Sequence, residues 1–385
     1  MKSLSHLNLS TRHGARALIT LVVASALGLT ACSSSPDKPK PAELPPVAAL
    51  LTAKLAWTAQ VGPTSATVTP MVVGTSVFLA GGPGTVVALD ANTGQDLWRL
   101  NLGTPVSAGV GSDGQTTAVI TQDNELVAIA EGRVSWRVRL PARSFTAPLV
   151  AGARVFVLTA DRAVTAFDAQ TGARLWNQAR PGEPLVLRKS GVLLAVDDTL
   201  VVGLSGRLTG LNPLNGAIRW EAPVATARGT NEVERLVDLV GPVSRMGSSV
   251  CTRAYGSAVG CVDTSRGGVV WSKPAQGKTG VHGDDKLVFG SEADGQLLAW
   301  QRASGEQAWE SSRLKYRDLT APLSVGRVLA VGDSTGLVHL LSREDGSEMT
   351  RLSTDGSPVI AAPALAGQVM VVQTRKGGVY AWRPQ

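Results

Sequence analysis

Short apolar stretches recur along most of this chain and are separated by turns that contain glycine. Two examples are Arg154 to Thr159 and Ala163 to Phe167, in which apolar and polar residues alternate. A period of two predicts strands with one buried face. Apolar periodicity of helical length is rare in the sequence, so the pattern predicts an all-β protein.

One unit of the pattern runs from Ala166 to Trp176 and contains a strand end, a turn and the start of a new strand. Asp168 and Thr171 are residues whose side chains bond to their own turn backbone, and Gly172 readily takes the positive φ that a tight turn requires. Trp176 then begins the next strand.

This unit recurs at a period close to 40 residues. A glycine is followed four residues later by tryptophan in six places, and a seventh copy, Gly346 with Thr350, has lost the tryptophan. The six copies are Gly94/Trp98, Gly132/Trp136, Gly172/Trp176, Gly216/Trp220, Gly267/Trp271 and Gly305/Trp309. Such a period with four short strands per repeat is typical of a β-propeller, whose tryptophans we expect to pack between neighbouring blades.

The two ends of the repeat region predict the number of blades. Leu55 to Val61 contains Trp57 but no preceding glycine turn, whereas Val379 to Trp382 resembles the strand that precedes such a turn. If these halves form one blade, the ring has eight blades and no open edge. We therefore expect an eight-bladed β-propeller over residues 51–385, closed by pairing of an N-terminal strand with the C-terminal blade.

The N-terminal region indicates secretion and lipid anchoring. Residues 1–31 contain three basic residues and an apolar run, Ala17 to Leu29, which suits a signal peptide and is too short to span a bilayer. Leu29 to Cys32 resembles the lipobox of bacterial lipoproteins, in which the cysteine is acylated; an ordinary signal peptide with an incidental cysteine is the alternative. Ser33 after the cysteine favours the outer membrane, and residues 32–50 are expected to form a flexible tether.

Charge and candidate chemistry exclude several functions. Removal of residues 1–31 lowers the formal charge from +7 to +4. The remaining chain has no cluster of basic residues that would indicate nucleic-acid binding.

His282 and His339 lack neighbouring ligands at metal-binding spacing, so we expect surface or hairpin roles for them. The run from Gly109 to Gly114 matches a dinucleotide motif only by letter and is interpreted as a turn. We expect no metal, cofactor or catalytic residue.

Cys251 and Cys261 flank a turn signal at Tyr255-Gly256-Ser257. Their symmetric spacing about Gly256 would place them opposite each other on adjacent strands. An oxidising periplasm permits a disulfide bond, but only some cross-strand pairs have the required geometry, so the sequence leaves the bond open.

Two connections break the period: Asn177 to Ser190 and Glu221 to Val240. Both contain large apolar and charged residues, and long loops are often functional. We interpret them as a binding surface, with merely decorative loops as the alternative. Since the two blades are consecutive, we expect the loops to lie side by side.

The repeat Ala88-x-Asp90-x-x-Thr93-Gly94-x-x-x-Trp98 resembles the tryptophan-docking repeat of pyrroloquinoline-quinone dehydrogenases. Those enzymes carry a vicinal disulfide at the cofactor, and no two cysteines are adjacent in this chain. An enzyme of that class is therefore a less favoured hypothesis. A periplasmic carrier or chaperone propeller is a separate alternative.

The lipobox, tether, eight repeats and two loop motifs are more similar to the BamB family of outer-membrane lipoproteins. The resemblance implies a scaffold without cofactor that binds the POTRA domains of BamA in the β-barrel assembly machinery, and it leaves open whether unfolded outer-membrane proteins are contacted. It also implies a partner-binding role for Leu185, Leu187, Arg188 and Asp238. The alternative is that both leucines point into the blade core, and that Asp238 holds Arg235 or Arg188 in place.

Overall fold

The computed structural model describes residues 39–47, 50–180, 185–227, 230 and 236–384. It divides into two compact units, residues 1–40 and 41–385. The expected signal peptide and the lipidation residue Cys32 lie outside the described residues, as does Arg235. Nowhere in the described residues is there a helix with the length and apolar character needed to cross a bilayer.

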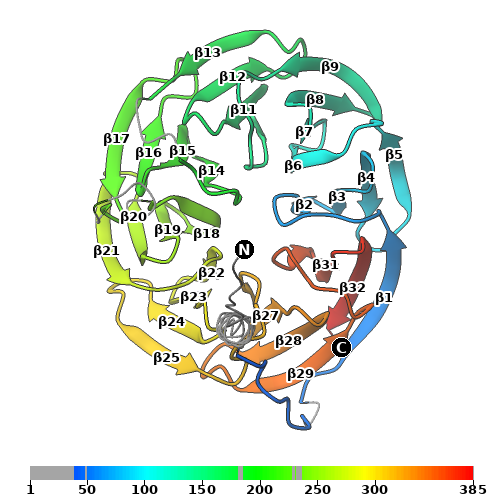
Figure 1. Ribbon diagram of the computed structural model, residues 1–385, viewed down its shortest axis with the longest axis vertical. Coiled ribbons are helices and arrows are strands. Elements are labelled where there is room, and N and C mark those ends of the chain that lie inside the picture. The colour runs from blue at the N-terminus through cyan, green and yellow to red at the C-terminus, as the bar shows by residue number, and fades with distance from the viewer. Residues whose placement is uncertain (1–38, 48–49, 181–184, 228–229, 231–235, 385) are drawn as a thin grey trace, which may run out of the picture. The chain divides into compact units, whose positions relative to one another are not determined.

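In the described part of residues 41–385, the strands form eight four-stranded antiparallel sheets arranged as the blades of a ring (Figure 1). Blades 1 to 4 consist of β2 (Met71–Val73), β3 (Ser76–Gly81), β4 (Thr85–Asp90) and β5 (Asp96–Asn101); β6 (Val106–Ser112), β7 (Thr116–Thr121), β8 (Glu125–Ala130) and β9 (Arg133–Arg139); β10 (Leu149–Ala151), β11 (Arg154–Leu158), β12 (Val164–Asp168) and β13 (Arg174–Gln178); β14 (Leu193–Val196), β15 (Thr199–Leu204), β16 (Arg207–Leu211) and β17 (Ile218–Pro223).

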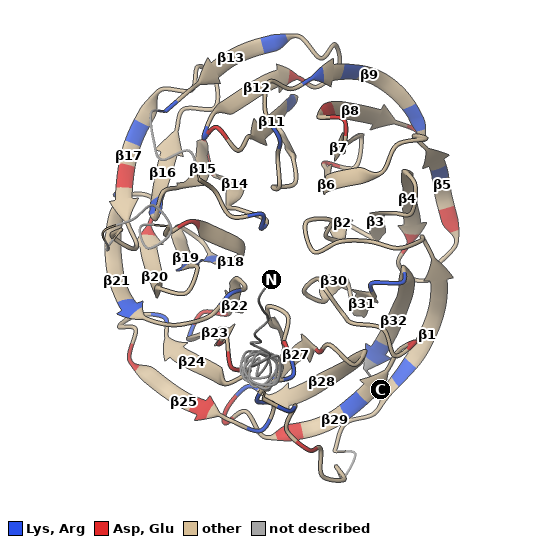
Figure 2. Cartoon of the chain, viewed as in Figure 1, with Lys and Arg blue, Asp and Glu red and all other residues tan. Residues whose placement is uncertain are grey.

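Blades 5 to 8 consist of β18 (Leu239–Met246), β19 (Ser249–Ala254), β20 (Ala258–Asp263) and β21 (Gly268–Pro274); β22 (Val281–Gly283), β23 (Leu287–Ser291), β24 (Leu297–Gln301) and β25 (Gln307–Ser311); β26 (Leu323–Val325), β27 (Val328–Gly332), β28 (Leu337–Ser342) and β29 (Glu348–Ser353); β30 (Ala364–Ala366), β31 (Val369–Gln373), β32 (Gly378–Pro384) and β1 (Ala53–Gln60). The first strand of each blade lies at the centre of the ring and the fourth at its rim (Figure 1). The outer strands β5 and β17 each carry charges of both signs (Figure 2).

Pairing of β1 with β32 closes the ring, as the sequence predicted. The two strands are antiparallel, with Trp57 opposite Ala381 and Ala59 opposite Val379. In Figure 1, β1 (blue) runs beside β32 (red). The pairing lies within blade 8, where β1 covers the edge of β32 that would otherwise be unpaired.

The tryptophans of the outer strands dock on the next blade, which confirms the predicted interblade packing. Trp57 shows the arrangement: its Nε1 donates a hydrogen bond to the carbonyl of Ala91 at 2.8 Å, and it lies against Gly94 in the turn of blade 1. Gly94 has a φ of 73°, and a Cβ there would lie 2.5 Å from the indole of Trp57. The turn therefore needs glycine both for its backbone conformation and for the space that the tryptophan occupies.

The run from Gly109 to Gly114 differs from its interpretation as a turn. Residues up to Ser112 belong to β6, and the turn begins at Asp113, whose Oδ1 accepts the backbone N–H groups of Gln115 and Thr116. Register shifts in the pairing of β6 with β7 allow this glycine-rich stretch to remain a strand.

The expected tether differs from the structure at its C-terminal end. Within residues 41–50, Ala42 donates its N–H to the carbonyl of Lys315 at 2.9 Å, and Leu50 donates to Met349 at 3.0 Å. Arg317 and Arg351 donate to the carbonyls of Ala42 and Pro45, at 2.9 and 3.0 Å. Ala42, Pro45 and Leu50 therefore lie against blade 7 and the connection that leads into it, where two arginines satisfy backbone groups that a free linker would leave to water.

The same arginines belong to a buried polar cluster that includes His339. Of the two expected roles for this histidine, a surface position was wrong, whereas His339 does lie in the hairpin of β27 and β28. His339 is fully buried in β28 between Asp333 and Glu348. Arg317 pairs with Asp333 at 2.8 Å, and Arg351 pairs with Glu348. Each buried charge thus has a partner of opposite charge.

Candidate partner-binding surface

The two period-breaking loops lie side by side, as expected for connections of consecutive blades. One loop joins β13 to β14 and the other joins β17 to β18. The backbone N–H of Leu187 donates to Asp238 Oδ2 at 2.8 Å, which joins the described parts of the two loops directly. Gly241, in the first strand of blade 5, donates its N–H to the carbonyl of Ser190 at 2.9 Å and extends the contact between the two loops.

Arg162 joins both loops to blade 3. Its guanidinium donates to the carbonyl of Leu185 at 3.0 Å and to Asp238 Oδ1 at 3.2 Å. It also donates to Ser205 Oγ in blade 4 at 2.6 Å. The residue is only 7% exposed, so these bonds act in a medium that screens charge less than water does. We call Arg162, Leu185, Leu187 and Asp238 the loop latch.

Arg162 is the residue that sequence reasoning missed, although its repeat position carried a signal. It has a φ of 62° at the end of the turn between β11 and β12, and its N–H bonds to the carbonyl three residues earlier. The corresponding turn position in other blades holds Asn124, Gly295, Gly336 or Gly377. An arginine at a position where four other repeats have glycine or asparagine adopts a sparsely populated backbone conformation, which indicates a role for its side chain.

Asp238 pairs with Arg162, a partner that the sequence did not suggest; of the two suggested partners, Arg235 lies outside the described residues. Its carboxylate accepts hydrogen bonds from Arg162 and from the backbone of Leu187. Arg188 places its guanidinium over the ring of Phe145, 5.7 Å from the centroid, so the alternative in which Asp238 holds Arg188 was wrong. Arg188 remains exposed, which leaves its hydrogen-bond donors available on the surface.

The leucines occupy different environments. Leu185 is 38% exposed, and Leu187 is half-buried over a small cavity of about 50 Å³ that Asp238 also lines. Neither leucine belongs to one of the buried core clusters of the described residues. The exposed apolar side chain of Leu185 and the charged head of Arg188 thus flank a backbone that the latch holds in place.

A larger cavity of about 500 Å³ adjoins Arg188 on the same side of the ring. Its lining comes from blade 2 and from the connections β1–β2, β9–β10 and β13–β14, and its charged members, Arg143 and Arg188, are both basic. Phe145, which contacts Arg188, lies on its wall. The surface therefore combines an exposed leucine, two arginines and an aromatic ring, which is a mixture typical of protein interfaces.

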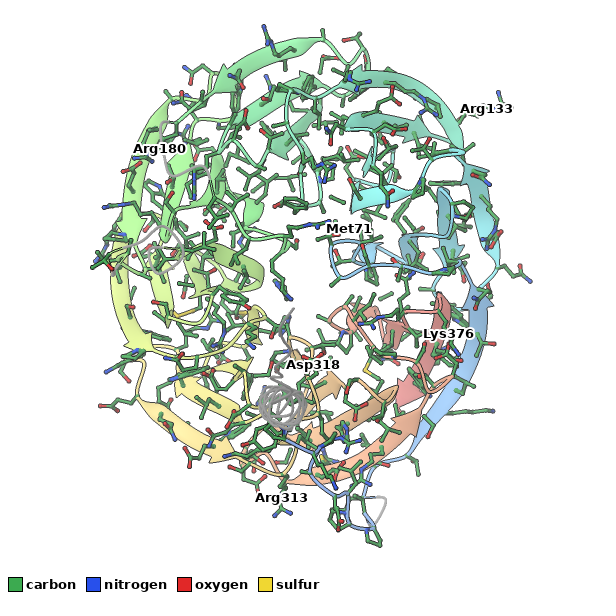
Figure 3. All side chains as sticks on the ribbon, viewed as in Figure 1. Met71, Arg133, Arg180, Arg313, Asp318 and Lys376 are labelled. Carbon is green, nitrogen blue, oxygen red and sulfur yellow. A yellow bond between two sulfur atoms is a disulfide. The ribbon has the colours of Figure 1, made fainter. Side chains whose placement is uncertain are left out.

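An ion pair joins the strands from which the two loops emerge. Arg180, labelled in Figure 3, follows β13, and its guanidinium bonds to Glu221 of β17. This hydrogen bond holds the pKa of Glu221 below its usual value, against the opposing effect of burial. The two loops are thus joined near their N-terminal ends by Arg180 and Glu221, and near their C-terminal ends by Leu187 and Asp238.

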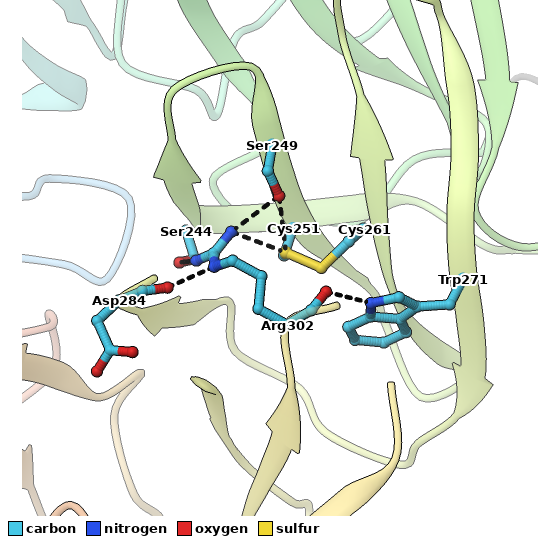
Figure 4. Close-up of a disulfide and its surroundings, with 7 residues drawn as sticks. All are labelled: Ser244, Ser249, Cys251, Cys261, Trp271, Asp284 and Arg302. Carbon is cyan, nitrogen blue, oxygen red and sulfur yellow. Dashed lines mark hydrogen bonds between the residues drawn. A yellow bond between two sulfur atoms is a disulfide. The ribbon is translucent and has the colours of Figure 1, made fainter. Parts of the chain in front are cut away.

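Cys251 and Cys261 face each other across β19 and β20 and are joined by a disulfide bond in the structure (Figure 4). Both are fully buried. Arg302 donates to Cys251 Sγ at 3.2 Å and to Ser249 Oγ at 3.1 Å, and its own carbonyl accepts the indole N–H of Trp271 at 2.7 Å. This position is part of the packing between blades 5 and 6, away from the loop latch. Among the described residues, no three His, Cys, Asp or Glu side chains are placed to hold a metal ion.

A ring of eight four-stranded blades with tryptophans docked on turn glycines defines a quinoprotein-like β-propeller. Residues 82–311 match the family model described as outer membrane protein assembly factor BamB. The BamB of Burkholderia pseudomallei is 38% identical over 94% of this chain and 96% of its own length. The BamB of Bordetella pertussis is 37% identical over 93% and 95%. The chain therefore belongs to the BamB family of outer-membrane protein assembly factors.

Solved structures agree with this assignment. The crystal structure of BamB from Moraxella catarrhalis has a TM-score of 0.78 and 25% identity, and it covers 86% of this chain and all of its own. A quinohemoprotein alcohol dehydrogenase from Comamonas testosteroni has a TM-score of 0.66 at 15% identity, covering 87% of this chain and 77% of its own. The second likeness concerns the fold alone.

Proposed function

We propose that this protein is a non-catalytic scaffold of the β-barrel assembly machinery, and that the surface around the loop latch binds the periplasmic POTRA domains of BamA. The observation that carries the proposal is the latch itself. Arg162 and Asp238 hold the backbone of two loops so that Leu185 and Arg188 are presented outward. A surface that is ordered before binding loses less conformational entropy when a partner arrives.

The chemistry of the surface supports a protein partner. An exposed leucine supplies apolar contact area, and a planar guanidinium binds carboxylates or backbone carbonyls with defined geometry. Because Phe145 already supports the guanidinium of Arg188, fewer conformations are lost when it engages a partner. In this scheme Asp238 and Arg162 are positioning residues, and Leu185 and Arg188 make contact.

Membrane attachment follows from the same proposal. Cys32, acylated and left as the first residue of the mature protein when residues 1–31 are removed, anchors the protein to the outer membrane, where the propeller faces the periplasm. Several acyl chains, at about 0.8 kcal/mol per buried methylene, give stable attachment. The propeller then acts at the membrane without itself entering it.

The test compares partner capture by surface variants with matched controls. Leu185→Ser and Arg188→Ala should each weaken BamA recovery in a pull-down of the lipidated protein, with melting curves nearly unchanged because both side chains are exposed. Leu175→Ser and Arg174→Ala are the controls, since both residues are exposed on β13 of the same blade and outside the loops. Normal BamA recovery by both loop variants would place the partner site elsewhere on the propeller.

A further inference from the structure

The interface between blades 7 and 8 lacks the tryptophan that fills the other seven described interfaces. In those blades the outer-strand tryptophan lies opposite a small residue of the third strand. The pairs are Trp57/Ala381, Trp98/Ala88, Trp136/Ala128, Trp176/Ala166, Trp220/Gly210, Trp271/Cys261 and Trp309/Ala299. In blade 7 the corresponding pair is Thr350 opposite Leu340, so the large residue has moved to the inner of the two strands.

The receiving side of this interface is different as well. In blades 1 to 7 the tryptophan of the preceding blade lies against a turn glycine between the third and fourth strands, as Trp309 does against Gly346. In blade 8 the fourth strand is β1, so no such turn joins it to β32. The tryptophan and the turn that would receive it are therefore both missing at the same place.

The neighbouring interface identifies the vacant position. Between blades 6 and 7, the cluster that contains Trp309 has members from both blades. Among them are Leu287, Phe289 and Ala299 of blade 6 and Leu329 and Leu341 of blade 7. The strand registers give the corresponding residues at the interface of blades 7 and 8 as Val328, Ala330, Leu340, Met370 and Trp382.

All five of these residues line a single cavity of about 520 Å³. The larger side chains of Met370 and Trp382 fill part of the space, but Ala330 replaces a phenylalanine and leaves space open. The volume is in the usual range of about 300 to 1,000 Å³ for ligand sites. The cavity is thus lined by the residues that correspond to five neighbours of the tryptophan at the interface of blades 6 and 7, together with Leu51 and Ala53 of the N-terminal segment.

The residues that line the cavity favour an apolar ligand, and a positively charged side chain lies at its mouth. Among the described residues that line the cavity, Arg327 and Gln368 are the polar ones, both are exposed, and none is acidic. Trp382 stacks on Tyr380 at 5.8 Å and offers an aromatic ring on the wall. Aromatic rings pair favourably with one another, and a guanidinium at the mouth can lie over a ring that enters.

We propose that this cavity binds an aromatic side chain of another polypeptide, taking the place of the missing tryptophan. The equivalent space at the other interfaces holds an indole, and the lining here keeps the apolar character of those sites. The occupant enters from the surface, because no residue of blade 7 supplies it from within. This site lies between blades 7 and 8, whereas the loop latch lies between blades 3 and 5, so the two can be tested independently.

The test uses indole and N-acetyl-tryptophanamide as probes in thermal unfolding and equilibrium binding. Both should raise the melting temperature of the full-length protein in a saturable way, since a ligand that binds only the folded state stabilises it. The double variant Leu340→Ala with Thr350→Trp restores a large outer-strand residue opposite a small third-strand residue, as in the other blades, and should place an indole in the cavity next to position 340. It should melt at a higher temperature and bind indole at least tenfold more weakly.

A second variant keeps the test decisive if the double variant folds poorly. Ala330→Phe introduces the residue found at this position in blade 6 and should also reduce indole binding at least tenfold. Equal stabilisation of the wild type and the filled variants, or no stabilisation of either, would overturn the proposal. Stabilisation by octyl glucoside but not by indole would do so too, because it would assign the cavity to acyl chains.

Discussion

The imidazole Nδ1 of His339 lies 2.8 Å from Oε1 of Glu348 in the interior of blade 7, and its Nε2 lies 3.1 Å from Oδ2 of Asp333. Burial by itself lowers the pKa of His339, but the two carboxylates outweigh it and raise the pKa above 6.5. The same contacts, with Arg351, bring the pKa of Glu348 down to about 2 although burial opposes them. The charged forms of both residues therefore stabilise the folded state.

The first prediction follows from these pKa shifts. A raised histidine pKa contributes stability that is fully present below pH 6.5 and is lost as pH rises through the folded-state value. A lowered glutamate pKa contributes stability above pH 4.5 that is lost as pH falls toward 2. The melting temperature, followed by circular dichroism, should decline on both sides of this range.

The variant His339→Gln distinguishes the alkaline decline in melting temperature from the acid decline. It should lower the melting temperature at pH 6 and flatten the alkaline decline, while the acid decline remains. Arg317 and Arg351 also face the carboxylates of this cluster, so the variant leaves each carboxylate a partner. If the curves of the variant and the wild type ran parallel above pH 6.5, His339 would not be the titrating group.

The second prediction concerns Arg162. Arg162→Ala should lower the free energy of unfolding by about 1 to 3 kcal/mol, because hydrogen bonds from a charged and buried donor are lost. Arg162→Gly loses the same bonds but relieves the positive φ, which costs about 1 to 3 kcal/mol for other residues, so it should be less destabilised. Both variants should weaken BamA capture several-fold, because the loops lose their support.

Asn124→Gly is the matched control, since it changes the equivalent turn position in blade 2. It should leave partner capture unchanged. Wild-type capture by Arg162→Gly would show that the guanidinium does not position the loops.

Sequence patterns were enough for the parts of this protein that repeat. Gly172 and Trp176 recur with their neighbours, and each repeat requires the same local turn, so the blade count and the interblade tryptophans could be predicted. The role of Arg162 could not be predicted in the same way. Its partners Ser205 and Asp238 come from segments 43 and 76 residues away, and only the folded ring brings them together.

Burial of single polar residues was also beyond the sequence pattern. His339 occupies an alternating strand like many others, and its burial depends on carboxylates supplied by a turn and by the neighbouring strand. The contact of residues 41–50 with Arg317 depends on that same cluster. A proline-rich composition predicts an extended chain, but it does not show which surface lies next to it.

The third prediction concerns the closing strand. Deletion of residues 53–60 should expose the edge of β32 and cause aggregation, because unpaired strand edges associate with other chains. Analytical ultracentrifugation would measure the assembly state. A monomeric deletion variant with an unchanged melting temperature would contradict a closed ring that needs β1.

The fourth prediction concerns the anchor. Cys32→Ser should prevent acylation and release the protein from the outer membrane, while the propeller still folds, since residues 41–385 form a compact unit of their own. Fractionation after a salt and carbonate wash measures attachment, and circular dichroism checks the fold. Retention of the variant in the washed outer membrane would disprove Cys32 as the anchor.

Closure of the ring by β1 also sets an order of events during synthesis. Ala59 pairs with Val379, 320 residues later in the chain, so the first blade strand to be synthesised pairs with the last. Bringing such distant ends together is entropically costly and slows folding. Until β32 has been synthesised, β1 has no partner strand, so the ring cannot close before the last strand of the chain is made.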